Sequence, residues 1–91
     1  MELRKKTEMI VIHCAATKPS MDIGSAEIKK WHVEENGWDD IGYHHIIKRD
    51  GLIEAGRPIA FKGAHAPSAN SKSIAICLVG GMSEDGDAEN N

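Results

Sequence analysis

Two short runs of apolar, mostly β-branched residues stand out along the chain. The first, Glu-Met-Ile-Val-Ile-His-Cys, spans residues 8–14, and the second, Ser-Ile-Ala-Ile-Cys-Leu-Val, spans residues 73–79. Continuous apolar runs of this length are typical of strands that are covered on both faces of a sheet. We therefore expect two buried strands, the first of which ends at His13.

Between these runs, the pattern changes to helical spacing. A turn-rich stretch at 15–23 leads into residues 25–36, where Ile28, Trp31 and His32 recur on one side and charged residues fill the other. Gly37 then fits a C-terminal cap. This spacing predicts a helix over 25–36 that lays Ile28 and Trp31 on the sheet.

Residues 43–55 alternate as the two arms of a hairpin, with Asp50-Gly51 as the favoured two-residue turn. A loop of about fifteen residues follows, and loops of that length inside compact domains tend to be functional. The order strand, helix, hairpin, loop, strand predicts an α/β fold with a mixed sheet and one long covering helix. Because only one long helix is expected, one face of the sheet should lack cover. We assign residues 1–82 to this domain and residues 83–91 to an acidic, flexible tail.

Composition narrows the possible partners. The net charge is -3, and no basic run is longer than Arg4-Lys5-Lys6, so the sequence lacks the charge pattern of a nucleic-acid binder. No window has the roughly 20 apolar residues of a membrane helix, and the N-terminus has no apolar run typical of a secretory signal. We expect a protein made in the cytoplasm without nucleic-acid or membrane partners. Cys14 and Cys77 are then expected to be reduced core residues rather than a disulfide.

No metal or nucleophile motif is present by spacing alone. His13 at a strand end and His65 in a long loop with glycine and proline both occupy places where sites are often built. An isolated histidine at a strand end is more often structural than a ligand. From the residues alone, both readings of His13 stay open.

Six segments in a fixed order are informative together. They read Ile-Val-Ile-His-Cys-Ala-Ala-Thr at 10–17, Gly-Trp-Asp-Asp-Ile-Gly-Tyr-His at 37–44, Ile-Ile-Lys-Arg-Asp-Gly at 46–51, Glu-Ala-Gly-Arg at 54–57, Gly-Ala-His-Ala at 63–66 and Ser-Ile-Ala-Ile-Cys-Leu-Val-Gly-Gly at 73–81. This order closely resembles the N-acetylmuramoyl-L-alanine amidases of the bacteriophage-lysozyme and peptidoglycan-recognition superfamily, over residues 8–82.

The resemblance implies a zinc hydrolase that cuts the amide between N-acetylmuramic acid and L-alanine in peptidoglycan, causing cell-wall lysis. It implies that His13 is a zinc ligand and that Tyr43 is catalytic, orienting the attacking water. It further implies that His65 and Asn70 line the groove for the stem peptide. Muramic acid and the stem peptide would be the partners, and the cell wall would be the place of action after release.

The resemblance also implies an incomplete zinc site, because the family's other ligands lie downstream of the last matched strand and the sequence ends at Asn91. A catalytic zinc site normally has three protein ligands. His45 stands where these amidases usually carry an apolar or aromatic residue, and it could share a face with Tyr43 and act as a substitute ligand. The alternatives are a non-catalytic peptidoglycan-binding or vestigial module, and a regulatory partner of another protein. A homodimer or a second chain that completes the site is also expected.

Overall fold

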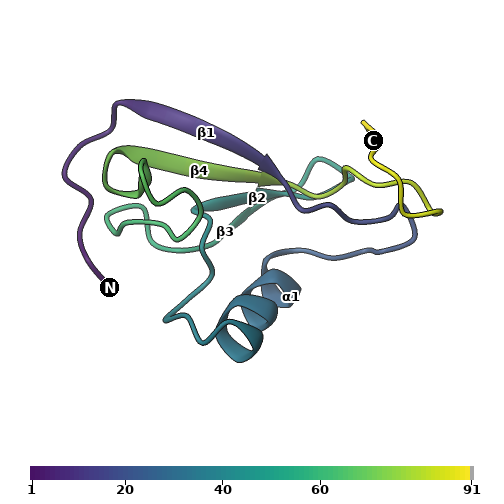
Figure 1. The fold of residues 1–91 in the computed structure, drawn as a ribbon, viewed down its shortest axis with the longest axis horizontal. Coiled ribbons are helices and arrows are strands. Elements are labelled where there is room, and N and C mark those ends of the chain that lie inside the picture. Colours follow the sequence, from purple (N-terminus) through teal and green to yellow (C-terminus); the bar gives the residue numbers. More distant parts are fainter. Residues whose placement is uncertain (91) are drawn as a thin grey trace.

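The computed structural model of the protein describes residues 1–90. Within these residues, four strands form one mixed sheet in the order β1-β4-β2-β3, where β4 is parallel to β1 and β2, and β3 is antiparallel to β2. Figure 1 shows α1 on one side of the sheet and β1 along its outer edge. The predicted α/β architecture with one covering helix is confirmed. In chain order the elements are β1 (Met9–Cys14), α1 (Ser25–Lys30), a π-helical continuation (Trp31–Glu35), β2 (His45–Ile47), β3 (Ile53–Ala55), a 3-10 turn (Asn70–Lys72) and β4 (Ser73–Leu78).

The helix predicted over 25–36 forms, but its second half is π-helical instead of α-helical. The Asn36 N–H donates to the carbonyl of Trp31, five residues earlier, at 3.3 Å. Gly37 follows with φ of +73°, as expected for a glycine that ends a helix. Ile28 is buried and Trp31 packs against the core, so the predicted contact of these two side chains with the sheet is confirmed.

The hairpin forms as well, but its turn differs from the predicted Asp50-Gly51 turn. The Lys48 N–H donates to the Leu52 carbonyl, and the Gly51 N–H donates to the Lys48 carbonyl, both at 2.9 Å. These bonds leave three residues, 49–51, in the loop. Gly51 has φ of +88°, which fits the last position of a three-residue hairpin loop. The Asp50 carboxylate accepts from the Leu52 N–H at 2.9 Å and so stabilises this longer turn.

The core lies between α1 and the sheet, and the opposite face of the sheet is uncovered. Ile10, Ile12 and Ile53 on that face are 60%, 65% and 64% exposed. The prediction of one uncovered face is confirmed, whereas the expectation that β1 is buried on both faces is wrong, because β1 is an edge strand that has cover on one face only. The buried apolar core consists of Ile23, Ile28, Ile41, Ile46, Cys77 and Val79.

The acidic segment after β4 makes local and long-range contacts. Met82 bridges to Ala88, and the Glu84 carboxylate accepts from the backbone N–H and the hydroxyl of Ser20. The flexibility predicted for residues 83–91 stays a prediction, and Asn91 lies outside the described residues. In the described part of the chain, no helix has both the length and the apolar character needed to cross a membrane.

Candidate active site

His13 lies near the carboxyl end of β1, in register with Cys77 of the parallel strand β4. Cys77 belongs to the core beneath α1, and residues in register point to the same face of a sheet, so His13 lies on the helix-covered face. Its ring is half-buried. The carboxyl ends of parallel strands are the usual position for binding sites in α/β sheets.

Tyr43 lies beside His13, and their ring centroids are 5.3 Å apart. Burial, together with the neighbouring Cys77 thiol, raises the pKa of Tyr43 to about 12. The phenol therefore stays protonated at neutral pH and can donate a hydrogen bond to a group bound next to His13. The Arg57 N–H donates to the Tyr43 carbonyl at 2.8 Å, which holds the tyrosine backbone in place.

His65 reaches His13 from the long loop, although 52 residues separate them. Its Nδ1 lies 2.8 Å from His13 Nε2, and its Nε2 lies 3.2 Å from the Ser73 hydroxyl. Burial, and secondarily the charge of His13, lowers the pKa of His65 to about 4, so this ring is neutral at pH 7. The resemblance implied that His65 lines the groove for the stem peptide. The contact with Ser73 anchors the His65 ring to the start of β4, and the contact with His13 brings the ring into the site.

Asn70 braces the loop that carries His65. The Asn70 Oδ1 atom accepts from the N–H groups of His65 and Ala66 at 3.2 and 3.0 Å. Asn70 and His65 also line a pocket of about 220 Å³ together with Trp38, Ala64 and Pro67. Two of the four predicted site residues thus lie at this pocket; of the other two, His13 contacts His65 and Tyr43 contacts His13. The substrate-binding role of His65 and Asn70 stays a prediction.

Arg57 supports the site, a role that was not predicted from the sequence. Its side chain is 7% exposed and donates to the carbonyls of Ile41, Lys62 and Asp40 at 2.8, 2.7 and 3.2 Å. These bonds tie the segment before Tyr43 to the loop before His65. The only signal in the sequence was its position between Gly56 and Pro58, inside a motif of the resemblance.

Two further histidines are structural. His44 is buried, its Nε2 lies 2.7 Å from the Phe61 carbonyl, and its Nδ1 accepts from the Ala75 N–H at 3.0 Å. His32 accepts from the Gly42 N–H at 2.8 Å and packs on Trp38, with ring centroids 4.6 Å apart. Burial lowers the pKa of both rings.

His45 does not join the site. It is in register with Ile76, which alternates with the core residue Cys77, so His45 lies on the uncovered face. The expectation that His45 shares a face with Tyr43 is wrong, because β2 begins at His45 and strand alternation does not extend back to residue 43. Cys14 and Cys77 are both free, as predicted, but only Cys77 is a core residue. The expectation that Cys14 lies in the core is wrong, because Cys14 is on the uncovered face of the sheet and is exposed.

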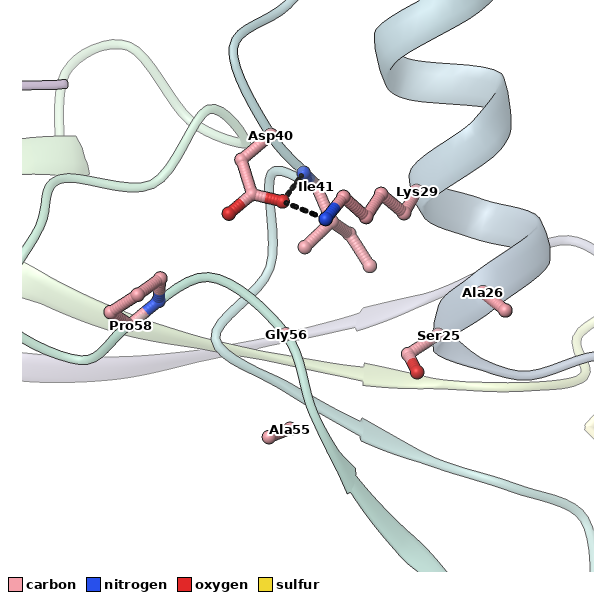
Figure 2. A pocket seen from close by; sticks show the side chains of 8 residues that line it. All are labelled: Ser25, Ala26, Lys29, Asp40, Ile41, Ala55, Gly56 and Pro58. Carbon is pink, nitrogen blue, oxygen red and sulfur yellow. Dashed lines mark hydrogen bonds and ion pairs between the residues drawn. The ribbon is translucent and has the colours of Figure 1, made fainter.

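A separate pocket of about 330 Å³ lies between the start of α1 and the end of β3 (Figure 2). The Asp40 carboxylate accepts from the Ile41 N–H at 2.7 Å and lies 3.6 Å from the Lys29 ammonium. This pocket shares no residue with the cluster of His13, Tyr43 and His65. It is lined by Ser25, Ala26, Lys29, Asp40, Ile41, Ala55, Gly56 and Pro58.

The side chains of the described residues fit one ligand of a zinc site but do not make up a complete set of ligands. Among residues 1–90, no three His, Cys, Asp or Glu side chains are grouped so that they could hold a metal ion. Cys77 is next to His13 in register, but burial raises the pKa of its thiol to about 11, which disfavours the thiolate that binds metals. The role of His13 as a metal ligand therefore stays a prediction.

Comparison with known proteins agrees with this geometry. A family model described as N-acetylmuramoyl-L-alanine amidase matches residues 3–90. The chain belongs to this amidase family. It is 51% identical to the endolysin of Escherichia phage T7 over 88 residues, which cover 97% of this chain and 58% of the endolysin.

Solved structures share the fold. The chain resembles the N-acetylmuramoyl-L-alanine amidase LysC from Clostridium intestinale with a TM-score of 0.72 and 34% identity, over 84% of this chain and 48% of LysC. It also resembles peptidoglycan recognition protein-LE in complex with tracheal cytotoxin, a monomeric diaminopimelic acid-type peptidoglycan. That match has a TM-score of 0.72 and 27% identity and covers 94% of this chain and 55% of the other. The chain thus spans about half the length of these relatives.

Proposed function

We propose that this chain supplies one part of the active site of a zinc-dependent amidase, which hydrolyses the bond between N-acetylmuramic acid and L-alanine in peptidoglycan. The observation that carries the proposal is the cluster of His13, Tyr43 and His65 at the carboxyl end of β1, in a chain of the amidase family. The cell wall would be the place of action, as the endolysin relative suggests. Synthesis in the cytoplasm stays a prediction.

The proposed roles follow from the chemistry of each group. His13 would be a zinc ligand, and a zinc ion bound there would lower the pKa of its water and polarise the scissile carbonyl. Tyr43, which keeps its proton at neutral pH, would donate a hydrogen bond to the substrate carbonyl or to its tetrahedral form. His13 alone cannot make a catalytic site, so further ligands must come from another segment or chain.

The pocket of Trp38, Ala64, His65, Pro67 and Asn70 would hold part of the stem peptide. It adjoins the His13 cluster through His65. The side-chain Nδ2 of Asn70 is a donor that could bind a peptide carbonyl, since Asn70 uses its Oδ1 within the loop. The related structure with tracheal cytotoxin supports a peptidoglycan fragment as the ligand class.

A second candidate function is peptidoglycan binding without hydrolysis. It is favoured by the lack of a three-ligand group among residues 1–90. In this function the pocket beside His65 would still bind the stem peptide, whereas no turnover would occur without added ligands.

One set of measurements separates the two functions. We would measure zinc per chain, binding of a soluble muropeptide by calorimetry, and release of stem peptide from purified peptidoglycan with and without added zinc. Stoichiometric zinc with chelator-sensitive release would support the hydrolase. Muropeptide binding without release would support the binding module, and the loss of both in a folded sample would exclude both functions.

Matched variants show whether His13 carries the zinc. His13→Ala should abolish any zinc binding or release. His45→Ala is the control, because it removes the same side chain from the opposite face of the sheet. Equal effects of the two variants would contradict the assignment.

We further propose that a second copy of this chain pairs with the edge strand β1, so that the uncovered faces of the two sheets become continuous. β1 is an edge strand, and Ile10, Ile12 and Leu78 next to it are exposed on that face. Edge strands with exposed apolar residues are prone to pairing. Lys5 and Lys6 precede β1, whereas Glu84 and its acidic neighbours follow the bridge of Thr17 to Gly81 beyond its end. An antiparallel β1–β1 pair would therefore place the basic end of one copy beside the acidic end of the other.

Sedimentation velocity across a concentration and salt series tests this pairing. Ile12→Glu should shift the chain towards monomer, and high salt should weaken the dimer because it screens the paired ends. Ile59→Glu introduces the same charge at an exposed isoleucine outside the sheet and is the control. A monomer at all concentrations of the unaltered chain would refute the proposal.

A further inference from the structure

The hydroxyl of Ser73 takes part in two hydrogen bonds, donating in one and accepting in the other. Ser73 is fully buried at the start of β4, and its Oγ donates to the Ala69 carbonyl at 2.8 Å. A serine hydroxyl has one hydrogen, and a carbonyl can only accept. The same Oγ lies 3.2 Å from His65 Nε2, so in this second contact the serine accepts and His65 donates.

The direction of the next hydrogen bond follows. A neutral imidazole has one N–H and one acceptor nitrogen. If His65 carries its hydrogen on Nε2, its Nδ1 is an acceptor, and the only ring atom facing it at 2.8 Å is His13 Nε2. His13 must therefore donate from Nε2, which leaves the lone pair on His13 Nδ1 free.

We propose that Ser73 is a positioning residue whose hydroxyl, acting through His65, fixes the Nε2–H tautomer of His13 and leaves His13 Nδ1 as the nitrogen that can bind a metal. Metal-binding histidines commonly donate their second ring N–H to a fixed acceptor, which orients the ring and selects the tautomer. Here the acceptor is another histidine, and its own tautomer is set by a buried hydroxyl. This inference deepens the proposed role of His13 as a zinc ligand.

The reversed chain of hydrogen bonds would have the opposite consequence. In it, Ser73 would donate to His65 Nε2, His65 would donate from Nδ1, and His13 would accept on Nε2 and carry its hydrogen on Nδ1. Neither nitrogen of His13 would then have a free lone pair. The carbonyl of the buried residue Ala69 would also lose its bond from Ser73 and would keep only the bond from the Lys72 N–H. The two directions therefore differ in the tautomer of both histidines, which can be measured directly.

The experiment uses the metal-free chain with ¹⁵N-labelled histidine at about pH 7.5, above the ordinary titration range of an imidazole. Two-bond ¹H–¹⁵N spectra show for each ring which nitrogen is protonated. We expect protonated Nε2 and unprotonated Nδ1 signals for both His13 and His65. His44 is an internal reference, because Phe61 and Ala75 fix its Nε2–H form through backbone bonds. Protonated Nδ1 on His13 in the unaltered chain would overturn the proposal.

Variants then test the role of Ser73. In Ser73→Ala, the Nδ1 signals of His65 and His13 should both shift towards the protonated position, while those of His44 stay unchanged. Ser71→Ala removes a hydroxyl two residues away and should leave all rings as they were. His65→Ala, which leaves Ser73 intact, should shift His13 alone and serves if Ser73→Ala does not fold. Unshifted His13 signals in a folded variant of either kind would refute the proposal. Because no zinc or turnover is involved, failure of this test is distinct from failure of the proposed function.

Discussion

Replacing Arg57 is the strongest single test of how the loops around the site are held in place. Its guanidinium is buried and donates to three backbone carbonyls, those of Ile41, Lys62 and Asp40. In Arg57→Met, most of the side-chain volume remains, but all three carbonyls lose a charged donor. Hydrogen bonds to charged groups contribute about 1.5–3 kcal/mol each.

The net loss is smaller than the sum of three such bonds. The bond to Ile41 is buried, whereas the other two are partly buried, so water can replace part of them. Removing a buried charge also relieves its desolvation cost. We therefore expect Arg57→Met to lower the free energy of unfolding by about 3 kcal/mol. A chain of this length has roughly 5–14 kcal/mol in total, so the variant should fold but with a much reduced margin.

Urea unfolding followed by tryptophan fluorescence measures this change. Arg57→Lys should recover only about a third of the loss, because an ammonium cannot bond three carbonyls in the fork geometry of a guanidinium. Lys30→Met is the matched control, since Lys30 is an exposed cation on α1, and its effect should stay within about 0.5 kcal/mol. If Arg57→Met has no larger effect than Lys30→Met, the role assigned to Arg57 is refuted.

Three further outcomes follow from single contacts. Gly42→Ala should destabilise the chain by about 1–3 kcal/mol in the same urea assay, because the new Cβ would lie 2.3 Å from the Ala64 carbonyl oxygen; an unchanged midpoint would contradict this packing. Burial lowers the pKa of His44 below its ordinary 6.5, so the unfolded chain binds the proton more tightly. The free energy of unfolding should be highest above about pH 6.5 and should fall as the pH drops below that value. A free energy of unfolding that stays constant between about pH 8 and 5 would exclude this linkage. Cys14 should react with a thiol reagent at neutral pH well before Cys77, which is buried and whose pKa is raised to about 11; equal rates would show that the core opens readily.

The strands and the helix could be predicted because their signals are local. The apolar runs give β1 and β4 to within a residue, and the spacing of Ile28 and Trp31 gives the helix and its buried side. The hairpin turn was mispredicted because the Asp-Gly pair fits both a two-residue and a three-residue loop. The choice is made by the bond from the Leu52 N–H to the Asp50 carboxylate, which composition does not reveal.

The site was predictable only in part. The positions of His13 and Tyr43 follow from the resemblance to the amidases, and the structure brings their rings together. The contact between His65 and His13 depends on the path of a loop that has no periodic pattern. Arg57 and Ser73 each lie in a segment that carries the resemblance, but the segment does not reveal their roles, because these roles consist of bonds to backbone carbonyls and to another side chain. Such bonds depend on the tertiary structure rather than on residue spacing.

The arrangement of the sheet places the proposed site and the proposed pairing surface on different faces of β1. β1 carries His13 on the face beneath α1 and carries Ile10 and Ile12 on the uncovered face, because successive side chains alternate. A change at Ile12 can therefore alter association without reaching the hydrogen-bond chain of His13, His65 and Ser73. The reverse also holds, since Ser73 is fully buried on the helix side. If Ile12→Glu shifted the His13 ring signals while the chain stayed folded, the two faces would be coupled through β1, and the assignment of separate roles to them would have to be abandoned.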